Sequence, residues 1–281
     1  MESGGIQMSY KEALDGKKIA ISISESENMN ALGLSEAHLD EAMCEVARHM
    51  LALGATLLYG GDIRARGFTR LLYELVSRYR KDSVDFKSVA SVISYLPWSS
   101  ITTITPDELR TLKSDLSDTA EICLLDLDGN PTEFAFTADD RSSAHLHWAR
   151  SLRQMRIRTT NESMARIVLG GKTNGFMGDM PGIAEEVLIS LNAEKAVYLL
   201  GGFGGCTRDI LDLIGVQNPH QTSAPNWPGS DLFSAFRIES LNNGLSSAEN
   251  MALATTPYVD QAVVLIIRGL LNVISQATPL D

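Results

Sequence analysis

The sequence is poor in the residues that cross-link small secreted proteins. Its 281 residues include only three cysteines, Cys44, Cys123 and Cys206, and no two of them have CxxC spacing. Cysteines this few, and odd in number, predict neither a disulfide framework nor a zinc site. They fit a reducing compartment. A chain of this length can bury a full core without such links. We therefore expect a cytoplasmic protein without a structural metal.

Positive charge and long apolar segments are also scarce. Lys and Arg number 24 against 35 Asp and Glu, a net charge of −11. A general nucleic-acid binder needs a basic face, so we expect no nucleic-acid partner, although a local pocket can still be basic enough for a small anion. The N-terminal stretch lacks the apolar core of a secretory signal. The longest apolar stretch, 262–274, is shorter than the roughly 20 residues that span a bilayer. We expect it to be a buried helix, with no membrane partner.

Strand-like and helix-like segments alternate along the chain. Apolar or β-branched runs predict strands at 17–24, 56–59, 89–96, 121–127, 166–169 and 196–200. Amphipathic spacing predicts helices at 35–53, 68–80, 138–158, 181–191, 207–214 and 257–275, with a short helix opened by Pro106 inside 101–118. Such alternation is typical of a parallel sheet with both faces covered. We predict a Rossmann-like, three-layer α/β sandwich with a mostly parallel sheet.

We divide the chain into a tail (1–16), a nucleotide-binding domain (17–215), and an irregular excursion with a C-terminal helix packed on the same domain (216–281). Glycine pairs directly follow three of the predicted strands, at Gly60-Gly61, Gly170-Gly171 and Gly201-Gly202. Strand ends of a parallel sheet meet at one edge, where glycine backbone and helix N-termini can hold an anion. One pair indicates only a tight turn, but three favour a nucleotide-like ligand.

Two common nucleotide-binding motifs are missing. The first strand ends in Ser22–Ser26 without G-x-G-x-x-G, and Lys172-Thr173 lacks the upstream glycine spacing of a P-loop. A nicotinamide-dependent dehydrogenase and a P-loop NTPase are therefore disfavoured, and we expect no cofactor.

The order of the motifs resembles the SLOG superfamily. It runs from a strand ending in small hydroxyl residues through LLYGG and ARIVLGGKTNGFMGDMPGIAEEV to AVYLLGGFGG. The superfamily includes the LOG phosphoribohydrolases, the DNA-processing DprA/Smf proteins and the ligand-sensing domains of TRPM channels. The resemblance covers about 17–215, is specific in 166–205, and is greatest to prokaryotic SLOG proteins associated with TIR and Sir2 effectors in anti-phage defence. It implies nucleotide binding and suggests a homo-oligomer and an effector protein partner.

The resemblance also indicates a departure from the LOG enzymes, whose P-G-G-x-G-T-x-x-E loop binds phosphate and supplies a catalytic acid. The matching stretch here keeps the glycines, but Leu200 replaces the proline, Gly205 the threonine and Arg208 the glutamate. Asp209 lies one position late, about 100° around a helix. The resemblance therefore implies a binder more than a catalyst.

The candidate site residues lie in and around the strand-end loops. We predict the ligand-binding set to be Ser22, Ser24, Glu25, Gly60, Gly61, Arg64, Gly170, Gly171, Lys172, Gly175, Pro181, Gly182, Glu185, Gly201, Gly202, Phe203, Gly204 and Gly205. Arg64, Arg66 and Lys172 lie in or beside glycine loops and are individually better candidates for binding phosphate than the arginines of 150–158. Glu185 and Glu186 either complement a helix N-terminus or serve ribose hydroxyls or acid/base catalysis at an N-glycosidic carbon.

Other polar residues carry weaker interpretations. Arg150, Arg153, Arg156 and Arg158 form a stripe that is either solvated and paired with Asp139, Asp140 or Glu162, or sends one or two side chains to phosphates. His145 and His147 point apart on a helix, and Asp126 and Asp128 fit a turn better than a Mg²⁺ site. A helix N-terminus would lower the pKa of the Cys206 thiol.

Three functions follow from these observations. The first is a sensor of a nucleotide-derived signal, ADP-ribose-like or a cyclic nucleotide. The second is an N-glycosidic hydrolase, a phosphoribohydrolase or a deoxyribosyltransferase-like enzyme, with Glu185 or Glu186 as catalytic residue. The third, a single-stranded-DNA binder, ranks last because the chain lacks a basic composition.

Overall fold

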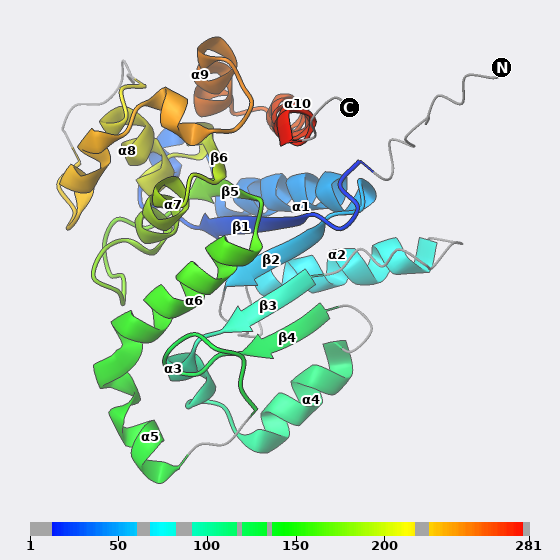
Figure 1. The fold of residues 1–281 in the computed structure, drawn as a ribbon, viewed down its shortest axis with the longest axis vertical. Coiled ribbons are helices and arrows are strands. Elements are labelled where there is room, and N and C mark those ends of the chain that lie inside the picture. The colour runs from blue at the N-terminus through cyan, green and yellow to red at the C-terminus, as the bar shows by residue number, and fades with distance from the viewer. Residues whose placement is uncertain are drawn as a thin grey trace.

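The computed structural model describes residues 13–60, 68–82, 92–116, 120–133, 137–216 and 225–277. Within them a parallel six-stranded sheet has the order β4-β3-β2-β1-β5-β6 (Figure 1). The strands are β1 (Lys18–Ser24), β2 (Thr56–Gly60), β3 (Val92–Leu96), β4 (Ala120–Leu124), β5 (Ala165–Gly170) and β6 (Ala196–Leu200). The predicted Rossmann-like α/β sandwich is confirmed.

Helices cover both faces of the sheet, so it is the middle of three layers (Figure 1). One face packs on α1 (Glu36–Ala52), α2 (Phe68–Asp82) and α10 (Val259–Ala277). The other packs on α6 (Trp148–Glu162), α7 (Gly182–Asn192) and α8 (Gly205–Leu213). At the β4 edge lie α3 (Trp98–Ile101) and α4 (Pro106–Leu116), and α9 (Ser247–Thr255) packs beside β6.

The central strand β1 determines where a ligand can bind. Its alternating side chains Ile19, Ile21 and Ile23 enter the α1 core, which leaves Ser22 and Ser24 on the face of α6 and α7. The chain leaves β1 toward β2 but leaves β5 toward β6, on the opposite side. The crevice at such a reversal in strand order is where open α/β sheets bind ligands.

Two predicted segments differ from the structure. The single helix predicted at 138–158 is divided into α5 (Ala138–Ser143), a 3-10 turn (Ala144–His147) and α6. The hydroxyls of Ser142 and Ser143 donate to the carbonyl of Asp139, a local bond that competes with regular helix. The excursion predicted as irregular contains α9, whose Ser246 and Glu249 form a capping box. That S-x-x-E signal was present in the sequence.

The C-terminal apolar segment forms a helix of the predicted length, shifted by two residues from 257–275 to Val259–Ala277. By length and composition the 19 residues of α10 could cross a membrane, yet 39% of its apolar 18-residue stretch is buried inside the structure. The buried side chains, among them Val263, Ile266 and Leu270, join the core shared with α1 and β6. This packing is consistent with a core helix of a soluble protein.

Candidate functional site

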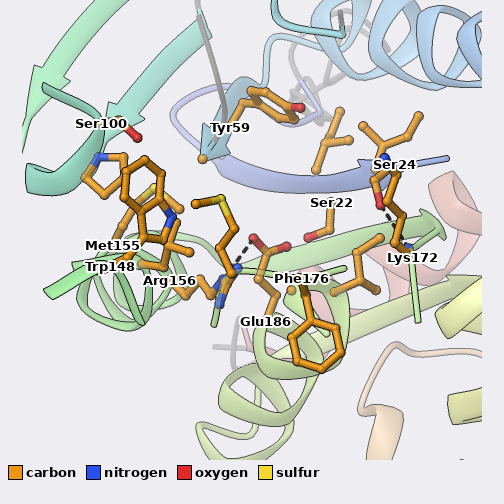
Figure 2. Close-up of a pocket in the computed structure, with 18 of the residues that line it drawn as sticks. Ser22, Ser24, Tyr59, Ser100, Trp148, Met155, Arg156, Lys172, Phe176 and Glu186 are labelled. Carbon is orange, nitrogen blue, oxygen red and sulfur yellow. Dashed lines mark hydrogen bonds and ion pairs between the residues drawn. The ribbon is translucent and has the colours of Figure 1, made fainter. Parts of the chain in front are cut away.

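A cleft of about 830 Å³ opens at the carboxyl ends of β1 and β2, beside the point where the strand order reverses (Figure 2). Its floor carries Ser22, Ser24 and Gly60, and its walls come from the α3–α4 region, from α6, and from the loop and first turn of α7. The predicted site residues that line it are Ser22, Ser24, Gly60, Lys172, Gly182 and Glu186. Gly61, Arg64 and Arg66 lie outside the described residues.

The structure separates the two adjacent glutamates of α7. Glu185 is 1% exposed, and its carboxylate accepts hydrogen bonds from Arg153, at 2.9 Å, and from Arg156. Glu186 lines the cleft and accepts a 3.2 Å hydrogen bond from Arg166. One residue turns a helical side chain by about 100°, which is enough to place the two carboxylates in different surroundings. Glu186 can therefore contact a ligand in the cleft, and Glu185 cannot.

Arg166 fixes the floor of the cleft, and the sequence reasoning missed it. It points from β5 between the sheet and α7, 1% exposed, and donates to the hydroxyls of Ser22 (2.7 Å), Ser190 (2.8 Å) and Thr160 (2.9 Å). Burial lowers the pKa of its guanidinium, while the neighbouring Glu186 carboxylate opposes that shift. Arg166 thus orients two residues that line the cleft, Ser22 and Glu186. A charged residue within the apolar strand run ARIVL was the available signal.

Arg156 is the member of the arginine stripe that lines the cleft. Its side chain is 8% exposed, and its Nε makes no hydrogen bond within the described part of the chain, although the Glu186 carboxylate lies 3.8 Å away (Figure 2). A buried donor without a partner costs about 1–3 kcal/mol. A ligand oxygen accepting from this Nε would remove that cost.

The rest of the stripe is paired with carboxylates. Arg158 binds Glu162, as one of the predicted pairings, while Arg150 binds Asp128 and Arg153 binds Glu185. Neither Asp139 nor Asp140 pairs with these arginines among the ion pairs of the described residues. These three arginines of the stripe are therefore engaged within the chain.

The loop after β5 already holds a carboxylate on its backbone. Thr173 N and Asn174 N donate to Glu27, at 3.2 and 3.1 Å, and the backbone N–H of Lys172 donates to Ser24 Oγ. Burial alone would raise the pKa of Glu27, but the hydrogen bonds outweigh it and hold the pKa below its ordinary value of 4.5. This loop is therefore suited to anions, and the exposed Lys172 side chain lies beside it at the cleft.

The third glycine loop serves packing and does not line the cleft. Gly205 N, at the start of α8, donates to Asn28 Oδ1 at 2.9 Å, and Cys206 N donates to Gly171 O. A Cβ added at Gly202 would lie 2.1 Å from the carbonyl oxygen of Thr256, beyond α9. The predicted binding residues that lie outside the cleft lining are Glu25, Gly170, Gly171, Gly175, Pro181, Glu185, Gly201, Gly202, Phe203, Gly204 and Gly205.

The residues at the position of the LOG catalytic acid are structural here. Arg208, 8% exposed, donates to the carbonyls of Ala254 and Val216, and Asp209 accepts from the Trp227 indole at 3.0 Å. The expected lowering of the Cys206 pKa is wrong, because burial of the thiol raises its pKa instead.

The remaining polar candidates also have structural partners. Asp126 Oδ1 accepts from the backbone of Asp128 and Asn130, which is turn chemistry. His145 contacts the Ser142 carbonyl, and His147 packs edge-on against Trp98. Among the residues whose positions are described, no three His, Cys, Asp or Glu side chains are grouped as metal ligands.

Comparison with known sequences identifies the family. A search of curated proteins gave no match. A family model described as SLOG cluster2 matches residues 13–253, a stretch that runs from before β1 through most of α9 and includes all the residues that line the cleft. The match supports a nucleotide-related function in general terms. With most of its length covered, the chain belongs to the SLOG family, in cluster 2.

Proposed function

We propose that this chain is a sensor that binds a nucleotide-derived signal, ADP-ribose-like or a cyclic nucleotide, in the cleft beside β1. Binding would change its assembly or its contact with an effector protein, in anti-phage defence signalling. The resemblance of 166–205 to defence-associated SLOG proteins supports this setting.

One observation carries the proposal: the cleft combines cations with a carboxylate held for hydrogen bonding. Lys172 lies at the cleft beside the anion-holding loop, and the unpartnered Arg156 Nε lies near Glu186. Arginine and lysine bind phosphate oxygens through charge-assisted hydrogen bonds. A carboxylate is the usual acceptor for ribose hydroxyls. A ligand that carries both groups would place its phosphate on the cations and its ribose hydroxyls on the Glu186 carboxylate.

The hydrolase hypothesis receives less support from the geometry. A catalytic carboxylate must reach the reacting atoms, and Glu185 is buried between two arginines. Glu186 does reach the cleft, but it is already hydrogen-bonded to Arg166. The acid of the LOG loop is replaced by Arg208, which bonds to backbone carbonyls. Binding is therefore the function that these residues support best.

Titration calorimetry with ADP-ribose, its cyclic isomers and cyclic nucleotides tests the proposal. We expect binding by the wild-type chain and roughly 10-fold or greater weakening by Lys172→Met, the effect of losing one hydrogen bond to a charged group. Lys195→Met is the matched control. Lys195 directly precedes β6, so it lies at the amino ends of the strands, whereas the cleft lies at their carboxyl ends. Light scattering with and without the ligand measures the change in assembly. Absence of binding across the whole panel would contradict the proposal.

A further inference from the structure

The cleft has a third zone that phosphate and ribose chemistry does not explain. Figure 2 shows Ser24 and Lys172 at one end, Arg156 and Glu186 in the middle, and Trp148 with Ser100 at the other end. This last end is apolar. The apolar lining comes from two segments, with Trp148, Leu152 and Met155 on α6 and with Pro97, Ile104 and Leu112 in the segment after β3 and in α4.

The two walls of the apolar end are held at a fixed spacing. Trp148, Leu152 and Met155 follow one another at i, i+4 and i+7, so they lie on one face of α6. The opposite wall comes from the segment after β3 and from α4. A buried hydrogen bond of 2.5 Å between the Ser99 and Ser151 hydroxyls ties α3 to α6. The apolar end is therefore a preformed slot.

The slot keeps apolar surface partly open to water. Trp148, Leu152, Ile104 and Leu112 are only half-buried. Removing apolar surface from water is favourable, so an apolar occupant would be stabilised here. The Ser100 hydroxyl also lines the slot and makes no hydrogen bond with the described residues, whereas Thr103 and Glu108 are both engaged locally. One uncommitted polar group in an apolar slot is typical of a site that orients a ligand.

We propose that this slot binds the base of the nucleotide-derived ligand, stacked against Trp148, with the Ser100 hydroxyl contacting a polar atom on the edge of the base. This assignment rests on the proposed function and fixes the direction of the ligand. The base lies between α6 and α4, the ribose hydroxyls reach Glu186, and the phosphate lies at Lys172. From the slot onward the cleft presents apolar side chains, then Glu186 beside Arg156, then Lys172, and this order matches base, ribose and phosphate in a nucleotide.

The test compares a ligand that has a base with one that lacks it. ADP-ribose and ribose 5-phosphate are titrated into the wild type, Trp148→Ala and Ser100→Ala. We expect Trp148→Ala to weaken ADP-ribose binding about 10- to 100-fold, the range for loss of one base–aromatic stack, and to leave ribose 5-phosphate within about twofold. Trp148→Phe keeps a ring and should retain ADP-ribose affinity within about threefold. Leu146→Ala, on an exposed side chain two residues away, is the control.

The outcomes separate this assignment from the proposed function. Equal weakening of both ligands by Trp148→Ala, or unchanged ADP-ribose binding in both Trp148→Ala and Ser100→Ala, overturns the base assignment alone. If the wild type binds no member of the nucleotide panel, the proposed function fails and the assignment fails with it. Fluorescence gives an independent readout, because Trp98 and Trp227 are buried and Trp148 is half-buried. ADP-ribose should quench the wild type, and Trp148→Phe should bind it without that quenching.

Discussion

Single side chains hold the loop after β1 against the loop after β5 and the start of α8. Glu27 accepts from two backbone N–H groups and the Thr173 hydroxyl, while the neighbouring Asn28 accepts from Gly205 N. A carboxylate thus occupies the β5 loop, and an amide oxygen occupies the start of α8. The chain itself uses both anion-accepting positions that the glycine pattern predicted at these two loops. What remains for a ligand in the cleft is consequently the Lys172 side chain and the Nε of Arg156, whose Nη1 is bound to Glu185.

The contact of Glu27 predicts a pH-dependent stability. Its folded-state pKa lies below the ordinary 4.5, so the carboxylate stabilises the fold above that pH and loses the effect as the pH falls through the folded-state pKa. After discounting for solvent screening, we expect Glu27→Gln to lower the free energy of unfolding by about 0.5–1 kcal/mol at neutral pH. The difference from wild type should vanish in acid. Urea unfolding at several pH values measures it, with the exposed Glu25→Gln as control; a difference that grows in acid would refute the assignment.

At the scale of elements, Arg166 joins β1, α6 and α7 to the strand that carries it. Its partners are Ser22 on β1, Thr160 on α6, and Ser190 and Glu186 on α7. Removing it would leave these buried groups without their donor. We expect Arg166→Met to lower the free energy of unfolding by about 3–5 kcal/mol, as for other broken buried ion pairs.

The control for this prediction is Arg150→Met. Arg150 and Asp128 form an ion pair with side chains 55% and 65% exposed, and such pairs contribute less than about 1 kcal/mol. Chemical denaturation of both variants gives the comparison. Equal losses in the two variants would show that Arg166 does not carry the structural role assigned to it.

Apolar runs and helical periodicity predicted the elements well because they report which side chains are buried. The β-branched run in 17–24 and the helical spacing in 35–53 each produced an element within a few residues of its prediction. Side-chain partners across elements are not periodic. Nothing local distinguishes Glu185 from Glu186, since only the packing of α6 on α7 decides which one meets Arg156 and which one meets the cleft. For the same reason, the sequence did not predict the role of Arg166 or the slot between α4 and α6, which both depend on contacts between elements.

At the scale of the whole molecule, α10 covers one face of the sheet beside β6 and α1. Its buried side chains complete the core made by α1 and the strands, and its outer side faces solvent. If α10 is a core helix, a charge should be tolerated on one side and not on the other. If it inserted into a bilayer, a charge on either side would be unfavourable.

Paired substitutions on α10 distinguish these cases. Val264 is 55% exposed and Ile266 is 0% exposed, although they lie only two positions apart. We expect Val264→Asp to change the free energy of unfolding by less than about 1 kcal/mol. Ile266→Asp should cost more than about 4 kcal/mol, because it buries a charge without a partner. Unfolding in detergent-free buffer measures both. Equal sensitivity at the two positions, or recovery of the wild type only with membranes, would contradict the assignment of α10 to the core.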